Sequence, residues 1–171
     1  MSGIVGSAGS KSKLFNFFGY IQVPFATTTI GTSETTMALT NQVSSVGMPK
    51  NAGFTVSDSD ETITIHIGGV YQLSILAQIH NNGASRENYI NAFKANGSVP
   101  TSSSTCIMEL YYVDSNAMGA QNYYSVAGTA IFEATGTNTQ IKFFGRMVND
   151  SAILQIETAH AQSCVTLIKL D

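Results

Sequence analysis

One stretch of strict alternation constrains this chain more than any other feature. Between residues 62 and 80, apolar side chains occupy every second position on either side of the pair Gly68-Gly69. A period of two puts alternate side chains on opposite faces of an extended strand. The pattern therefore predicts two half-buried β-strands, whose apolar residues are Ile63, Ile65 and Ile67 in the first and Tyr71, Leu73, Ile75, Ala77 and Ile79 in the second.

The two faces of the second predicted strand differ in character. The face that carries Tyr71, Leu73 and Ile75 is apolar throughout, and we expect it to line the core of a sandwich. The opposite face mixes polar and apolar residues at the even positions from Gln72 to His80. A mixed face on a long central strand is typical either of a subunit interface or of a sheet exterior. The alternation leaves both interpretations open.

Short strand-like runs continue to the end of the chain, and turns rich in Asn, Gly, Asp and Ser separate them. Examples are NNGAS at 81–85, KANGS at 94–98 and ATGTNT at 134–139, whose residues tolerate positive φ or cap a turn locally. The chain is poor in helix formers, so no helix longer than a turn or two is predicted. About ten antiparallel strands at this spacing indicate an all-β sandwich or barrel, of which the jelly-roll β-sandwich is a common form.

The sequence divides into an arm and one domain. Residues 1–13 are rich in Gly and Ser, with Ile4 and Val5 as hydrophobes, and predict a flexible N-terminal arm. Residues 14–171 have the length of a single domain. The aromatic-rich run 14–25 is predicted as its first strand, whereas the Ser- and Thr-rich segment 26–52 fits either short irregular strands or a long loop.

Charge narrows the choice of partners. The net charge is −3 and the isoelectric point is about 5.5, so there is no basic surface for nucleic acid or an anionic membrane. The sequence contains no run of about 18 apolar residues that could insert into a membrane, and its N-terminus lacks the pattern of a signal peptide. We therefore expect a soluble protein made in the cytosol. Cys106 and Cys164 each lie in an apolar run, which favours two buried thiols over a disulfide.

The sequence contains no compact catalytic signature, so we expect no enzymatic activity and no cofactor. His66 and His80 lie at the ends of neighbouring predicted strands and could approach one another, but no third metal ligand is evident. The acidic run SDSDE at 57–61 lacks the glycine and distant glutamate of a calcium loop and is interpreted as a solvated turn. The pairs Tyr111-Tyr112 and Tyr123-Tyr124 suit sugar stacking or an interface, with one ring of each pair outward.

Four stretches together resemble the tumour-necrosis-factor and complement globular-head superfamily. These are GFTVSDSDETITIHIGGVYQLSILAQI at 53–79, YINAFKANGSVP at 89–100, SVAGTAIFEATGTNTQIKFFG at 125–145 and the closing CVTLIKLD. The resemblance implies a ten-stranded jelly roll that assembles as a homotrimer around a three-fold axis. Gly69 and Tyr71 match the Gly-x-Tyr element of the family, which makes Tyr71 a core residue. Animal members often carry an aromatic residue on the axis where this chain has Ser74, and Tyr123 is close to another axis-facing position. The trimer interface that this implies comprises Gln72, Ser74, Leu76, Tyr123 and Ser125.

The N-terminal MSGIVGSAGSKS resembles the Gly/Ser-rich start of small virion structural proteins of tailed bacteriophages. This implies that the arm attaches the protein to capsid or tail proteins through Ile4, Val5, Gly6, Lys11 and Lys13. The first hypothesis is a capsid decoration (cement) protein, made in the host cytoplasm and located on the virion. The alternative is a fibre-tip or surface binding module that recognises a host receptor or glycan through loops such as 81–88 and 114–122. A cupin-like enzyme would need a His-rich metal set, which the sequence does not supply.

Overall fold

The computed structural model describes residues 20–40, 53–81, 87–113, 122–135, 138–148, 154–156 and 163–170. These residues contain no helix, which confirms the predicted all-β class. They form twelve strands, two more than the ten of the implied jelly roll: β1 (Tyr20–Pro24), β2 (Thr29–Ile30), β3 (Thr35–Thr36), β4 (Phe54–Ser57), β5 (Thr62–Ile65), β6 (Gly69–Asn81), β7 (Glu87–Asn96), β8 (Thr105–Val113), β9 (Asn122–Ala134), β10 (Thr139–Met147), β11 (Leu154–Ile156) and β12 (Cys164–Lys169). The predicted arm and the beginning of the predicted first strand lie outside the described residues.

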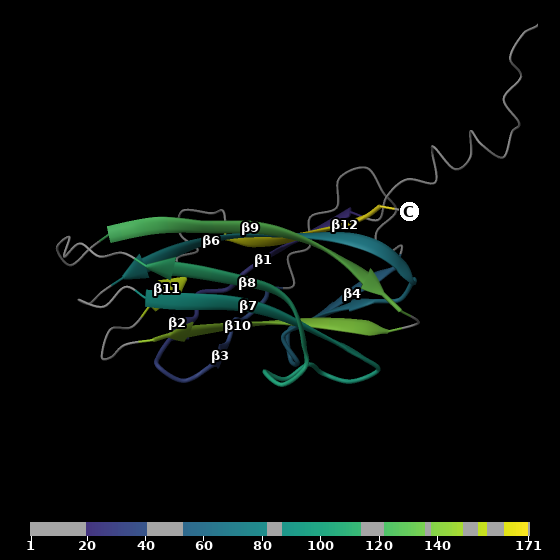
Figure 1. Cartoon of the computed structure of the whole chain (residues 1–171), viewed down its shortest axis with the longest axis horizontal. Coiled ribbons are helices and arrows are strands. Elements are labelled where there is room, and N and C mark those ends of the chain that lie inside the picture. The colour runs from purple at the N-terminus through teal and green to yellow at the C-terminus, as the bar shows by residue number, and fades with distance from the viewer. Residues whose placement is uncertain are drawn as a thin grey trace, which may run out of the picture.

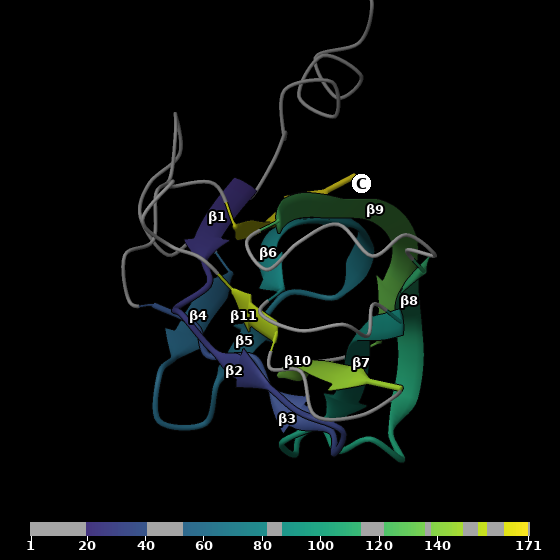
Figure 2. The same cartoon turned by 90° about the vertical axis from the view of Figure 1, so that its left-hand side faces the viewer.

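The strands pair antiparallel in two sheets that pack face to face (Figure 1). The first, here called the β6 sheet, has the order β1-β12-β6-β11-β2, with β9 along the other side of β6. The second, the β10 sheet, has the order β4-β5-β10-β7-β8, with β3 also paired to β10. Figure 2 views the same sandwich after a quarter turn and places β8 and β9 together at one edge. Consecutive strands thus cross repeatedly between the layers, as in a jelly roll.

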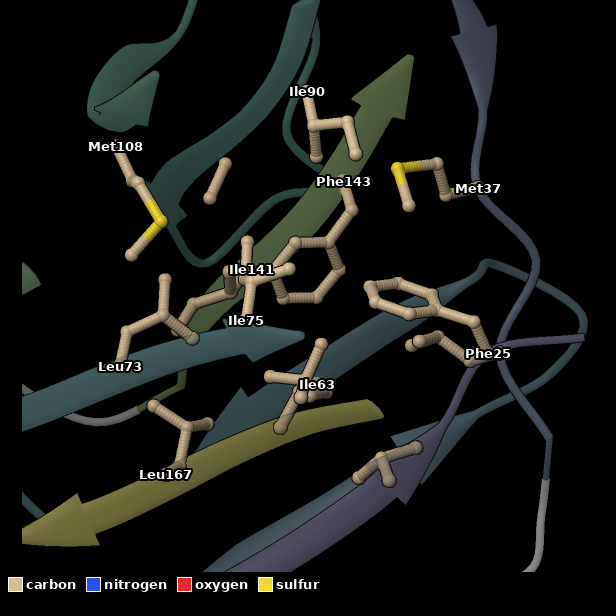
Figure 3. Packing of buried hydrophobic residues seen from close by; sticks show 14 of the residues in the cluster. Phe25, Met37, Ile63, Leu73, Ile75, Ile90, Met108, Ile141, Phe143 and Leu167 are labelled. Carbon is tan, nitrogen blue, oxygen red and sulfur yellow. The ribbon is translucent and has the colours of Figure 1, made fainter. Parts of the chain in front are cut away.

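The core fills the space between the sheets with the side chains that alternation placed inward. Tyr71, Leu73 and Ile75 of β6 are at most 2% exposed. They meet residues of β10 and β12, among them Ile141, Phe143 and Leu167 (Figure 3). Aromatic rings meet edge to face, with the centroids of Phe25 and Phe143 5.5 Å apart, an arrangement that aromatic quadrupoles favour.

The described part of the segment that follows β1, residues 26–40, forms short strands, one of the two forms that its sequence allowed: β2 joins the β6 sheet beside β11, and β3 joins the β10 sheet. The N–H of Met37 donates to the carbonyl of Phe143 at 2.9 Å, and the N–H of Leu39 donates to the Glu61 carboxylate. The segment also crosses close to Gly145, where an added Cβ would lie 2.5 Å from Cδ1 of the buried Ile30. Glycine at 145 is therefore required by this close approach. Residues 41–52 lie outside the described part of the chain.

Both cysteines are free, but the prediction that both are buried is wrong. Cys106 is exposed and Cys164 is half-buried. Cys106 is the second residue of the edge strand β8, whereas Cys164 lies on the outward side of β12, opposite Leu76. An apolar run in an edge strand does not guarantee burial, because only one side of that strand has a neighbour. The two thiols therefore belong to different sheets.

Candidate assembly surface

The outward side of the β6 sheet presents side chains from three adjacent strands. The register aligns Ser74 of β6 with Thr129 of β9 on one side and Thr166 of β12 on the other. The neighbouring rows are built in the same way. They are Gln72 with Ile131 and Ile168, Leu76 with Ala127 and Cys164, and Gln78 with Ser125. We call these residues, together with the Ser74 row and Gln22 of β1, the assembly face.

No residue of the assembly face carries a formal charge. Polar members bond to one another: the Ser74 and Thr129 hydroxyls are 3.0 Å apart, and the Gln22 amide donates to the Cys164 sulfur at 3.0 Å. Ile131 is 66% exposed, more than any other large hydrophobic residue that the structure describes. The face thus has no charge to desolvate, and depletion of charged residues is one property of interface cores.

A second apolar feature lies at the edge formed by β8 and β9. Within the described residues neither strand has a neighbour on its outer side. Leu110 of β8 and Ala130 of β9 are only partly buried against the core, and an added Cβ at Gly128 would lie 2.2 Å from Cδ2 of Leu110. The two strands therefore approach each other closely at Gly128, while the outer edge of each strand remains available for contact with another chain.

Four of the five residues of the implied trimer interface meet on the assembly face. Gln72, Ser74 and Leu76 are half-buried and Ser125 is exposed, all on the same side of the sheet. Tyr123 lies in β9 in register with His80, but its side chain is not among those described. The five predicted anchoring residues of the arm also lie outside the described residues. The sequence did not single out Thr129, Ile131 or Thr166, because their alignment with Ser74 depends on the register between strands.

The expectation that His66 and His80 approach each other is wrong. His66 follows β5 in the β10 sheet, whereas His80 lies near the far end of β6 in the other sheet. Gly69 and His80 are eleven residues apart along β6, which at about 3.3 Å per residue is roughly 36 Å. Both ring nitrogens of His66 already bond to protein atoms, Nε2 to the Thr55 hydroxyl at 2.9 Å and Nδ1 to Asn138 Oδ1 at 2.7 Å. His66 therefore fastens the turn before β10 to β4.

The acidic run 57–61 contains the turn between β4 and β5. Asp58 and Asp60 are exposed in the turn between β4 and β5, and the Ser57 hydroxyl bonds to the Asp60 carboxylate. Over the described ranges, no group of three or more His, Cys, Asp or Glu side chains is placed to hold a metal ion. No helix long and apolar enough to cross a membrane occurs in the part of the chain that the structure describes.

The architecture is that of a jelly-roll β-sandwich, and comparison with known structures gives its type. No protein-family model matches the sequence, and no curated protein is significantly similar to it in sequence. The Eiger TNF of S. frugiperda superposes with a TM-score of 0.60 at 10% identity, over 91% of this chain and 94% of that one. Murine APRIL, in the crystal structure at pH 5.0, superposes with a TM-score of 0.61 at 12% identity, over 90% and 99%. The chain thus has a TNF-like jelly-roll fold, the fold that the sequence resemblance implied.

Proposed function

We propose that this protein is a non-enzymatic virion structural protein of a tailed bacteriophage, and that it acts as a homotrimer. Its N-terminal arm attaches three jelly-roll heads to the capsid, where they decorate and cement neighbouring capsomers. The observation that carries the assembly part of the proposal is the uncharged assembly face, whose Ile131 is 66% exposed in the isolated chain. The phage part of the proposal draws support from the Gly/Ser-rich arm alone.

The proposed trimer uses two different uncharged or apolar surfaces on one subunit. The assembly face and the β8–β9 edge are not the same patch, so a contact between them is heterologous and forms a ring when the rotation closes. Three rotations of 120° close such a ring and cover both surfaces on every subunit. A trimer carries three arms, and three arms that bind one support together gain avidity without any new contact. The alternative is a fibre-tip or surface binding module that recognises a host receptor or glycan through loops such as 81–88 and 114–122, most of whose residues lie outside the described part of the chain.

The trimer is tested by the solution mass of the full chain. Multi-angle light scattering is expected to give three times 18.2 kDa, because a monomer would leave the assembly face in water. A mass that stays at 18.2 kDa across the accessible concentration range would remove the assembly proposal. The control is the same measurement in high salt. An interface that is held by apolar contact and neutral hydrogen bonds is expected to keep its mass there.

The anchoring role of the arm is tested by deleting residues 1–13. The shortened chain is expected to keep the trimeric mass, because the described sandwich begins at Tyr20, and to lose attachment to capsids of the parent phage. The measurement is co-sedimentation of purified protein with capsids that lack it, and the full chain serves as the control. Decoration by the shortened chain at the level of the full chain would contradict an anchoring role for residues 1–13.

A further inference from the structure

The outward side of the β10 sheet has a chemistry unlike that of the assembly face. Arg146 of β10, Tyr89 of β7 and Tyr111 of β8 share one row, because the register pairs Arg146 with Tyr89 and Tyr89 with Tyr111. The Arg146 guanidinium carbon lies 5.4 Å from the centroid of the Tyr89 ring. The rings of Tyr89 and Tyr111 stack with centroids 4.6 Å apart at 24°. The three side chains form a continuous stack that ends at Tyr111, on the edge strand.

Tyr111 is held in place but remains open to solvent. Its hydroxyl donates a hydrogen bond to the Glu87 carboxylate at 2.5 Å, and this bond, followed by burial, raises the pKa of Tyr111 to about 12. The phenol therefore keeps its proton, and the bond is retained, at neutral pH. The side chain is nevertheless 50% exposed. Tyr89 covers one side of this ring, so the side left for a ligand is the opposite one, which we call the platform.

Polar and charged side chains occupy neighbouring rows on the same side of the sheet as the platform. The next row of the same side of the sheet places Asn91 between Phe144 and the exposed Glu109. Lys142 extends over the Phe144 ring at 5.9 Å. Among these residues Glu87 and Glu109 are acidic and Lys142 and Arg146 are basic, two charges of each sign. The exposed Glu109 offers a carboxylate acceptor on the same strand as the exposed Tyr111 ring.

We propose that this surface binds a neutral sugar ring, stacked on Tyr111 and held by the surrounding polar groups. A hexose has one face of C–H groups, which suits the electron-rich face of an aromatic ring. It also has a rim of hydroxyls that can donate hydrogen bonds to a carboxylate such as Glu109. A protein partner is less well suited, because charged residues are depleted in the cores of protein interfaces. The balanced charge likewise gives an anionic ligand no net attraction.

The site is tested by saturation-transfer-difference NMR on the full-length protein. The probes are the methyl glycosides of glucose, galactose, mannose and N-acetylglucosamine, each at millimolar concentration. We expect at least one of them to receive saturation on the C–H protons of one ring face. Tyr111→Ala is expected to weaken binding of that glycoside about fivefold or more, because it removes the stacking surface. Tyr111→Phe keeps the ring and should retain most of the affinity.

The matched control is Ile67→Ala, which removes a hydrophobic side chain of similar exposure, 49%, from outside the platform. This variant should bind the glycoside as the wild type does. The proposal fails if no glycoside receives saturation, or if Tyr111→Ala binds as tightly as the wild type. A loss of equal size in Ile67→Ala would also overturn it.

Shifts of the Tyr89 and Tyr111 ring resonances during titration of the wild type provide a test free of any folding defect. Sugar binding is measured separately from the solution mass, so a monomeric mass would leave this proposal intact.

Discussion

A single arginine at position 129 is expected to turn the proposed trimer into a folded monomer. Thr129 is exposed on β9 and lies in the middle row of the assembly face, opposite Ser74. In the isolated subunit the new guanidinium remains in water, so the stability of the fold should change by less than about 0.5 kcal/mol. In the trimer each copy of the charge would be buried against uncharged neighbours, at a cost of about 3–5 kcal/mol. The dissociation constant should therefore rise at least about 100-fold.

Light scattering over a dilution series, or sedimentation equilibrium, measures this loss. The matched control is Thr64→Arg, which places the same charge on a strand of the opposite sheet, where Thr64 pairs with Gln140. That variant should keep the mass of the wild type. If Thr129→Arg dissociates no more readily than Thr64→Arg, the assembly face is not the interface, even if the wild type is a trimer.

The faces of β6 were predictable because one strand carries enough alternation to identify its buried side. Tyr71, Leu73 and Ile75 follow a period of two without interruption, and burial of one face fixes the register of such a strand. The same alternation identified Gln72, Ser74 and Leu76 as a separate surface. It did not indicate what lies beside them, because cross-strand neighbours such as Thr129 and Thr166 are more than fifty residues away in the sequence.

Features that depend on contacts between distant segments could not be predicted. The strands β2 and β3 have two residues each, too few to show any period, and contacts with Phe143 and Glu61 hold this part of the chain in place. His66 and His80 appeared close because consecutive strands often pair, but in this fold β5 and β6 belong to different sheets. The stack on the β10 sheet was missed for a similar reason, because Tyr89, Tyr111 and Arg146 come from three separate strands.

Truncation of Phe143 to alanine is expected to destabilise the fold strongly. Phe143 is fully buried on β10 between the two sheets, and Phe25 packs against its ring at an interplanar angle of 86°. Phe143→Ala removes this contact and leaves a cavity that the buried residues around it cannot fill without moving. The free energy of unfolding should fall by about 3–5 kcal/mol. Urea unfolding at a fixed protein concentration measures it, since assembly makes stability depend on concentration.

The adjacent phenylalanine is the matched control for this truncation. Phe144 lies on the same strand but points outward, where it is half-buried and meets Phe93 edge to face at 5.7 Å. Phe144→Ala removes the same number of atoms from the opposite side of the sheet, and solvent can fill much of the space. We therefore expect a loss of about 1–2 kcal/mol. Equal losses for the two variants would mean that the alternation along β10 does not define which side faces the core, and with it the assignment of outward residues on this sheet would fail.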